Sequence, residues 1–437
     1  MKRDCSLYFR NQFSFIRRGV VSYLFLIFAL GSQFLCFAQT YMIVPMDDSQ
    51  SNHLKAYGVV FWALKQGFEV EWLLNYRAGS FLVKDSQMLA LQCRMQGVSF
   101  EARDSLYREE ILSQMSEDNM ELVLLEKAPK IAVYSPPGKE PWDDAVTLVL
   151  TYAEIPHDVI WDEDVQRGKL DDYDWLHLHH EDFTGQYGKF YASFHNAPWY
   201  KKKVKEFRMA ARKAGFDSVK AHKCESAKLI RDYVARGGFL FAMCSACDTL
   251  DIALASEGVD IISPRIDGTP VDPNCQKKLD FTRCIAFKNF ELITSPFVYE
   301  YSNIDVSEYR NATSPEKERF VLFEFSAKFD PVEAMLTQCH RHEIKGFFGQ
   351  TTSFRRSVLQ QSVRILGDIP GQNRVKYIHG NHGRGTFTYL AGHDPEDFSH
   401  KVGDPPTDLS LHKNSPGYRL ILNNVLFPAA KKKHRKT

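Results

Sequence analysis

The sequence has little excess of charge of either sign. It contains 55 Lys and Arg residues against 54 Asp and Glu residues, which gives a formal net charge of +1. The first 38 residues carry five basic residues and one Asp, a net +4, which leaves −3 for the rest of the chain. Nucleic-acid binding depends on basic surface that neutralises phosphates. The sequence therefore predicts no nucleic-acid partner, and we expect the basic residues 431–437 to form a solvated tail.

Low-complexity segments and fixed-period repeats are also absent. About 13% of the residues are aromatic, so the chain has the apolar side chains that an ordinary core needs. Its length beyond residue 38 suits two domains or one large domain.

A stop-transfer cluster is missing after the one long apolar run near the N-terminus. Basic residues precede the run Val20–Leu30, and Cys36-Phe37-Ala38 fits a small-x-small cleavage site before Gln39. We therefore expect residues 1–38 to be a signal peptide, and the protein to be secreted or periplasmic, with no stable membrane insertion after cleavage. The alternative is an uncleaved anchor, because residues 20–38 are nearly long enough to span a bilayer.

Cysteine is scarce beyond the predicted leader. Nine cysteines are present, and Cys5 and Cys36 lie in the leader, which leaves seven. In an oxidising compartment an odd number leaves at least one thiol free or paired outside the chain. Cys275 and Cys284 bracket a loop and are a candidate disulfide.

Strand and helix patterns alternate along most of the chain, which predicts an α/β fold. We expect two successive doubly wound units of the flavodoxin or Rossmann kind, each with helices on a mostly parallel sheet. The first unit covers residues 39–129, and the second covers 130–430 with a less regular insertion around 266–370. Near the end of the chain, Val375–Ile378 and Thr386–Leu390 predict a hairpin, and Pro416–Leu426 predicts an apolar helix.

The sharpest local feature is a strand that runs directly into a turn of small residues. The strand Phe239–Met243 is followed by Cys244, and a helix begins near Asp248. Doubly wound sheets bind ligands at this end of a strand, and a following helix favours a thiolate. We expect Cys244 to be a nucleophile, with Ser245 binding substrate and the backbone amides of Ser245 and Ala246 receiving an oxyanion. A small buried hydrophobe and a redox pair of Cys244 with Cys247 are the alternatives.

A second strand, Thr386–Leu390, ends in small residues followed by His393. His393 is a candidate general base for the thiol, with Asp394 or Glu396 orienting its ring. Parallel strands end at the same edge of a sheet, so we expect the Cys244 and His393 side chains to lie roughly 3–5 Å apart.

A third strand end is rich in histidine. Period-two alternation places His177 and His179 on one face of the strand. We expect His179, His180, Glu181 and Asp182 to contact substrate at the carboxyl end. An alternative is a divalent metal held by His180, Glu181 and Asp182. No pair has the spacing of an established metal motif, so no cofactor is predicted, and the further metal candidates are His340, His342, Glu343, His379 and His382. In the first unit, Arg77 is a candidate anion contact.

The segment Gly238–Asp248 resembles the nucleophile turn of the class I glutamine amidotransferase-like superfamily, with Cys244 at the position of its catalytic Cys. Leu390–Asp394 and Pro416–Asn424 are similar to the ThuA-like, or trehalose-utilisation, branch. The resemblance covers roughly residues 130–426 and implies a class I amidotransferase-like fold for the second unit. The family usually has Gly after the nucleophile turn and Glu two residues beyond the His, where this sequence has Ser245-Ala246 and Asp394-Pro395-Glu396.

The chain beyond residue 38 also looks like exported bacterial proteins often labelled "asparagine synthetase B". Such a synthetase needs an ATP-pyrophosphatase loop of the Ser-Gly-Gly-x-Asp-Ser type, and none is present. Its glutaminase half needs an N-terminal Cys, whereas the predicted mature end is Gln39. The motifs do not support that label.

These patterns favour an exported cysteine-dependent hydrolase, amidase-like, that acts on a small polar substrate derived from an amide or a sugar. The alternative is a non-catalytic ThuA-like module that binds carbohydrate or another ligand. A thiol redox or metal protein is the third interpretation. The expected partner is a small molecule, and the sequence does not define the oligomeric state.

Overall fold

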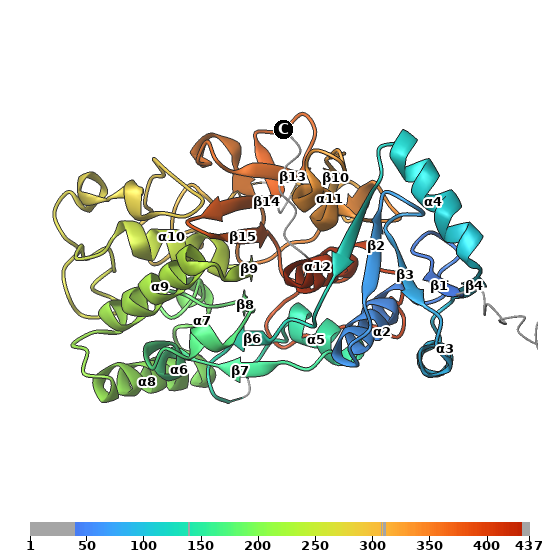
Figure 1. The fold of residues 1–437 in the computed structure, drawn as a ribbon. Coiled ribbons are helices and arrows are strands. Elements are labelled where there is room, and N and C mark those ends of the chain that lie inside the picture. The colour runs from blue at the N-terminus through green and yellow to red at the C-terminus, as the bar shows by residue number, and fades with distance from the viewer. Residues whose placement is uncertain (1–39, 139, 307, 309–311, 431–437) are drawn as a thin grey trace, which may run out of the picture. The chain divides into compact units, whose positions relative to one another are not determined.

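The computed structural model describes residues 40–138, 140–306, 308 and 312–430. The predicted signal peptide 1–38 and the basic tail 431–437 lie outside these residues. Among the described helices, none combines the length and the apolar character needed to cross a bilayer. The fold is α/β, as predicted, and contains two sheets (Figure 1).

The first sheet is formed by residues near the N-terminus and has the strand order β4-β1-β3-β2-β5. Its strands are β1 (Tyr41–Val44), β2 (Val70–Leu74), β3 (Ser80–Lys84), β4 (Glu101–Arg103) and β5 (Glu121–Leu125), and the helices between them are α2 (His53–Lys65), α3 (Gln87–Gln96) and α4 (Ser105–Glu117). Every neighbouring pair in this sheet is antiparallel. The expectation of a mostly parallel, doubly wound sheet over residues 39–129 is therefore wrong.

A tight hairpin after β2 explains the difference. Asn75, Arg77 and Ala78 adopt positive φ angles of 62°, 44° and 60°, and Gly79 follows at 85°. This left-handed backbone turns the chain directly into β3, which pairs antiparallel with β2 and lies between β1 and β2. The sequence analysis does not predict β3.

The second sheet contains a parallel half with the strand order β15-β9-β8-β6-β7. These strands are β6 (Ile131–Tyr134), β7 (Asp158–Ile160), β8 (Trp175–Leu178), β9 (Phe239–Met243) and β15 (Gly385–Leu390). The helices of this region are α5 (Ala145–Tyr152), α6 (Asp162–Gln166), α7 (Tyr191–Phe194), α8 (Pro198–Lys213), α9 (Val219–Arg236) and α10 (Ala246–Ala255). The parallel pairing expected for the second unit is confirmed here.

The other half of the second sheet is antiparallel. It comprises β10 (Arg319–Leu322), β11 (Glu343–Lys345), β12 (Phe354–Arg355), β13 (Arg364–Asp368) and β14 (Arg374–His382), with helix α11 (Pro331–Thr337). The predicted hairpin is present as β14 and β15, and Gly383 turns between them with φ at 60°. Short 3₁₀ helices are η1 (Lys169–Asp172), η2 (Cys275–Lys278), η3 (Phe281–Arg283), η4 (Arg356–Val358) and η5 (Phe427–Ala429).

The C-terminal helix α12 (Pro416–Leu426) has the predicted bounds and joins the two sheets into one core. It packs against α2 from the first unit and α5 from the second (Figure 1). Arg419, which is fully buried, donates to the hydroxyl of Tyr57 at 3.1 Å and to the backbone oxygen of Met46 at 2.8 Å. Leu422 and Val425 are also fully buried, and each such side chain stabilises the fold by about 1.5–3 kcal/mol. The hydrophobic core thus continues across residue 129.

Candidate active site

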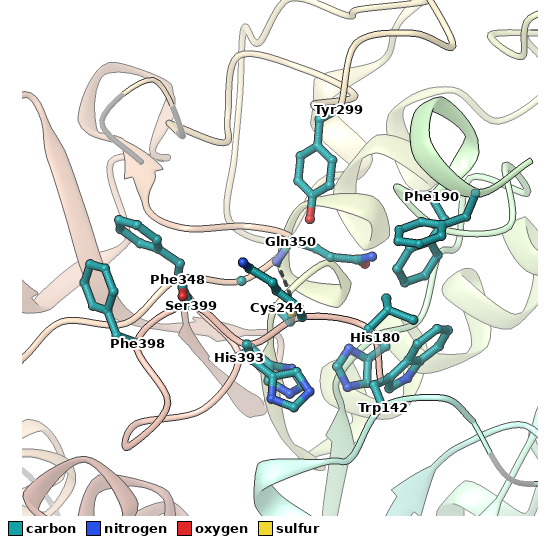
Figure 2. A pocket seen from close by; sticks show the side chains of 15 residues that line it. Trp142, His180, Phe190, Cys244, Tyr299, Phe348, Gln350, His393, Phe398 and Ser399 are labelled. Carbon is teal, nitrogen blue, oxygen red and sulfur yellow. Dashed lines mark hydrogen bonds between the residues drawn. The ribbon is translucent and has the colours of Figure 1, made fainter. Parts of the chain in front are cut away.

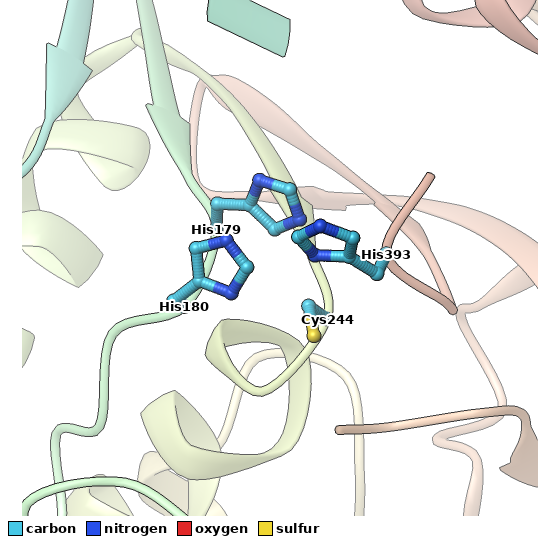
Figure 3. A group of neighbouring side chains, drawn as sticks. All are labelled: His179, His180, Cys244 and His393. Carbon is cyan, nitrogen blue, oxygen red and sulfur yellow. The ribbon is translucent and has the colours of Figure 1, made fainter. Parts of the chain in front are cut away.

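The three central parallel strands end at the same edge of the sheet. In the register of the sheet, Leu390 of β15 lies beside Met243 of β9, and Leu178 of β8 lies beside Ala242 of β9. The residues that follow these ends are His393 after β15, Cys244 after β9, and His179 and His180 after β8. One side-chain nitrogen or sulfur atom from each of these four residues lies within 4.8 Å of those of the others (Figure 3). The predicted proximity of Cys244 and His393 is confirmed.

Cys244 occupies a strained backbone position at the turn between β9 and α10. Its φ angle is +53°, in the left-handed region that an L-residue other than glycine rarely adopts. Such strain costs about 1–3 kcal/mol and clusters at functional sites. The thiol sulfur accepts a hydrogen bond of 3.0 Å from the backbone N–H of Gln350. A strained strand-to-helix turn that presents a reactive side chain is the geometry of a nucleophile elbow.

The residues after Cys244 play a more structural part than the sequence predicted. The backbone N–H of Ala246 donates to the backbone oxygen of His179 at 3.0 Å, so it does not point at a substrate. The predicted oxyanion role of Ala246 is therefore wrong. Ser245 is completely buried, its hydroxyl has no hydrogen-bond partner among the described residues, and it is not among the residues that line the neighbouring cavity.

A carboxylate from a distant loop orients His393. Asp143, just before α5, lies with Oδ1 at 3.3 Å from Nε2 of His393 and at 3.1 Å from Nε2 of His400. Burial opposes protonation of His393, but its interactions with Asp143 and Cys244 outweigh burial and raise its pKa from 6.5 to about 10. His393 is therefore an imidazolium at neutral pH.

The two carboxylates predicted to orient His393 lie elsewhere. Asp394 accepts hydrogen bonds from the hydroxyls of Thr407 at 2.7 Å and Tyr418 at 2.8 Å. Glu396 pairs with His412 at 3.2 Å. The prediction for Asp394 and Glu396 is corrected to Asp143, because the strand end turns the following side chains toward α12 and the C-terminal loop.

His179 and His180 contact the loop that contains Asp143 and Asp144. Nδ1 of His179 and Nε2 of His177 lie 3.2 Å and 3.3 Å from one carboxylate oxygen of Asp144, which confirms that these histidines share a face of β8. His180 donates from Nε2 to the backbone oxygen of Asp143 at 2.8 Å. Burial lowers the pKa of His179 to about 4, and it also lowers the pKa of His180 well below its usual value. Both rings are therefore neutral.

Glu181 and Asp182 do not join this cluster. Glu181 is buried and pairs with the ammonium of Lys223 at 3.2 Å. Asp182 accepts from the backbone N–H groups of Thr184 and Gly188 at 2.8 Å and 2.9 Å, and so shapes the loop after β8. Neither carboxylate belongs to a group of neighbouring ligand atoms with His180, so the metal set His180, Glu181 and Asp182 is wrong.

The other residues considered for a disulfide, an anion contact or a metal site lie away from this cluster. The seven described cysteines are all free thiols, so neither the Cys275–Cys284 disulfide nor a Cys244–Cys247 disulfide is present. Arg77 contacts the carboxylates of Asp47 and Glu101 at 2.6 Å and 3.0 Å, which satisfies the guanidinium that was expected to contact an anion. The remaining histidine candidates are spread over the fold: His340 stacks on His53, His342 faces Glu324, and His379 bonds Thr388.

Cys244 and His393 lie on the wall of a cavity of about 470 Å³, a size suited to a small ligand. Figure 2 shows Cys244 between Gln350 and His393, with aromatic rings on opposite sides of the cavity. The lining is mainly aromatic and imidazole side chains: Trp142, His180, Phe190, Phe194, Tyr299, Phe348, His393, Phe398 and His400, completed by Cys244, Gly349, Gln350, Ser399, Lys401 and Val402.

Sequence reasoning missed three residues of the site: Asp143, His400 and Gln350. A signal existed for Asp143, because it follows β6, which is parallel to β8 and ends at the same edge. His400 lies in the loop after His393, and no spacing marked it. Gln350 comes from the predicted insertion, whose position against the sheet depends on long-range packing.

No known family profile matches the chain, and no curated protein matches it. Among solved structures, the chain is similar to the cytoplasmic protein STM1381 of Salmonella typhimurium LT2, with 14% identity and a TM-score of 0.35 over 69% of this chain and 100% of that one. It is also similar to the cytoplasmic protein STM3548 of Salmonella typhimurium, with 12% identity and the same TM-score and coverages. Similarity at this level carries no functional argument.

Proposed function

We propose that the protein is an exported cysteine hydrolase that cleaves a small amide or sugar-derived substrate. The observation that carries this proposal is the left-handed backbone of Cys244, which presents its sulfur to the cavity within reach of His393. A buried cysteine with a purely structural role needs no such strain. The triad is Cys244, His393 and Asp143, with Asp143 taking the orienting role.

The proposed reaction on an amide proceeds in two steps. The Cys244 thiolate attacks the carbonyl carbon, a C–S bond forms, and the carbonyl oxygen receives the electron pair. His393 then gives its proton to the leaving nitrogen as the C–N bond breaks, which leaves a thioester. Neutral His393 takes a proton from water, the hydroxide attacks the thioester, and the acid product leaves as the thiolate and the imidazolium are restored.

Two donors of Gln350 suit this reaction. Its backbone N–H, 3.0 Å from the sulfur, stabilises negative charge on Sγ and is the donor we assign to the oxyanion. Its side-chain amide is buried on the cavity wall, and neither Oε1 nor Nε2 has a partner among the described residues. An amide with both atoms unpaired in a cavity is suited to a polar substrate group.

The second candidate is a module that binds a sugar without reacting. The aromatic rings of Trp142, Phe190 and Phe398 favour it, because the apolar face of a sugar packs on aromatic rings while its hydroxyls bond polar groups.

Alkylation by iodoacetamide, followed by peptide mass spectrometry, separates the two functions. We expect Cys244 to react fastest of the seven described thiols, and we expect C244A to lower hydrolysis of a panel of small amides and amino-sugar amides by about a thousandfold or more. C275S is the matched control, because Cys275 is a half-buried free thiol outside the cavity, and it should keep full turnover. A Cys244 that reacts no faster than the buried Cys247, together with sugar binding measured by calorimetry, would establish the binding module instead.

A further inference from the structure

The three imidazoles around Cys244 share one arrangement of their ring nitrogens. One nitrogen of each ring faces an oxygen of the Asp143-Asp144 loop: Nδ1 of His179 at 3.2 Å, Nε2 of His180 at 2.8 Å and Nε2 of His393 at 3.3 Å. A carbonyl or carboxylate oxygen holds the N–H of an imidazole, which leaves a lone pair on the other nitrogen. The neutral rings of His179 and His180 thus each have one nitrogen available for a ligand, and a bound ion would displace the second proton of the His393 imidazolium.

The available nitrogen of His179 has no partner. His179 is only 1% exposed, and its Nε2 is buried with no hydrogen bond to any described residue. A buried, unpaired polar atom costs about 1–3 kcal/mol and needs an explanation. Its neighbours in the cluster are two more imidazoles and a thiol, so the natural partner is an electron-pair acceptor rather than a hydrogen-bond donor.

We propose that His179, His180, His393 and Cys244 bind one divalent transition-metal ion of the Zn²⁺ class. Their four donor atoms all lie within 4.8 Å of one another (Figure 3). Imidazole nitrogen and thiolate sulfur are the ligands that such ions prefer, and a tetrahedral site separates its donors by about 3.5 Å. Side-chain rotation that draws the outermost atoms together by about 1 Å completes the shell.

The carboxylates behind the ring nitrogens support this assignment. Asp144 contacts both His179 and His177, and Asp143 contacts both His393 and His400. Histidines that bind metal usually donate their other N–H to a carboxylate or a backbone oxygen, which fixes the ring and its tautomer. His180 and His393 have that support through hydrogen bonds to Asp143, whereas Nδ1 of His179 lies 3.2 Å from the Asp144 carboxylate without hydrogen-bond geometry.

The metal site goes beyond the proposed hydrolase and competes with it, because one sulfur cannot attack a substrate while it is bound to a metal. Binding uses the sulfur of Cys244, and so it removes Cys244 from alkylation. A bound ion therefore keeps the hydrolase inactive until it is removed. The site itself does not require that hydrolysis occurs.

Titration with Co²⁺ after treatment with a chelator tests the site, because Co²⁺ reports its ligands by absorption. We expect one equivalent to bind and to show tetrahedral d–d bands together with a thiolate-to-cobalt band in the near ultraviolet. C244S should lose the near-ultraviolet band, and H179Q and H180Q should weaken binding by about a hundredfold or more. Zn²⁺ should displace Co²⁺ and protect Cys244 from iodoacetamide.

H382Q provides the matched control. His382 ends β14 beside Gly385, the first residue of β15, at the opposite edge of the sheet from His393. H382Q should bind Co²⁺ like the unaltered protein, and circular dichroism should show that every variant is folded. Binding without a thiolate band, or binding that H179Q leaves unchanged, would overturn the site. Fast alkylation of Cys244 without Co²⁺ binding would support the hydrolase and contradict the metal site. Co²⁺ binding without hydrolysis would support the metal site and contradict the hydrolase.

Discussion

Two buried polar clusters flank the Cys244 turn, and they differ in how completely their hydrogen bonds are made. In one, the ammonium of Lys189 is fully buried and contacts Asp248 at 2.8 Å, Asp305 at 3.2 Å, Thr351 at 3.0 Å and the backbone oxygen of Gln350 at 3.1 Å. Burial opposes the charge, but the two carboxylates outweigh it and raise the pKa of Lys189. This cluster ties α10 to the loop that contains Gln350.

The cluster of His179, His180, His393 and Cys244 is also buried, but some of its polar atoms, and some of those beside it, have no hydrogen-bond partner within the described part of the chain. Nε2 of His179 and Oδ2 of Asp143 are buried without a partner among the described residues. A satisfied buried network makes the fold rigid, whereas an unsatisfied one lowers stability and gains from a ligand. The Lys189 cluster therefore stabilises the fold around the turn, whereas the histidine cluster has the unpaired polar atoms expected of a ligand site.

Removal of the lysine charge should have the largest effect on stability. K189M leaves the carboxylates of Asp248 and Asp305 buried without their cation, and breaking a buried ion pair in this way costs about 3–5 kcal/mol. We expect the free energy of unfolding from urea titration to fall by this amount. C244A removes a small side chain from a strained position, and it should change the free energy of unfolding far less.

K202M controls for the loss of a lysine in general. Lys202 is exposed on α8, and its ion pair with Glu206 is long at 3.7 Å and open to solvent. It should leave the unfolding midpoint within experimental error. If K189M and K202M unfold alike, Lys189 is not scaffold, and the contrast between the clusters fails.

Local pattern in the sequence was sufficient to predict the strand ends of the site. Phe239–Met243 is a short apolar run that changes abruptly to small residues, and the same change occurs after Leu390. Parallel pairing then required both ends to meet at one edge, which the register of Met243 and Leu390 confirms. The catalytic roles of Cys244 and His393 remain predictions.

The parts that were missed depend on contacts between residues far apart in the chain. Asp143 precedes His393 by 250 positions, and Gln350 follows Cys244 by 106. No local period relates such residues, so the nearby Asp394 was preferred to Asp143. The hairpin at Asn75–Gly79 was missed for a different reason, because residues other than glycine take up most of its left-handed positions.

Neutralisation of Asp143 should change the histidine cluster without unfolding the protein. The pKa of His393 is raised from 6.5 to about 10, so its protonation stabilises the fold fully below pH 6.5, and this contribution is lost as the pH rises to about 10. D143N removes a charge that raises this pKa. In metal-free protein, we expect the NMR titration midpoint of His393, assigned by comparison with H393Q, to move below 10.

D397N is the matched control for D143N. Asp397 contacts Nδ1 of His400 at 2.9 Å, so this variant removes a carboxylate from the second histidine that Asp143 contacts. The His393 midpoint should stay near 10 in D397N. An equal change in both variants would mean that His393 responds to the general charge of the loop and not to Asp143.

Widening of the aromatic cavity should have the smallest effect, because it changes access to the site and leaves its chemistry in place. Phe398 lines the cavity and packs on Phe348 with ring centroids 4.3 Å apart. In F398A, we expect a bulky N-aryl maleimide to alkylate Cys244 severalfold faster, while the rate with the small reagent iodoacetamide stays nearly constant. F323A is the control, because Phe323 is 57% exposed and is not among the residues lining the cavity. The ratio of the two rates matters more than either rate alone, because a change in thiol reactivity would move both reagents together. A ratio in F398A equal to that in F323A would mean that Cys244 is reached by another route, and the cavity would lose its place as the substrate site.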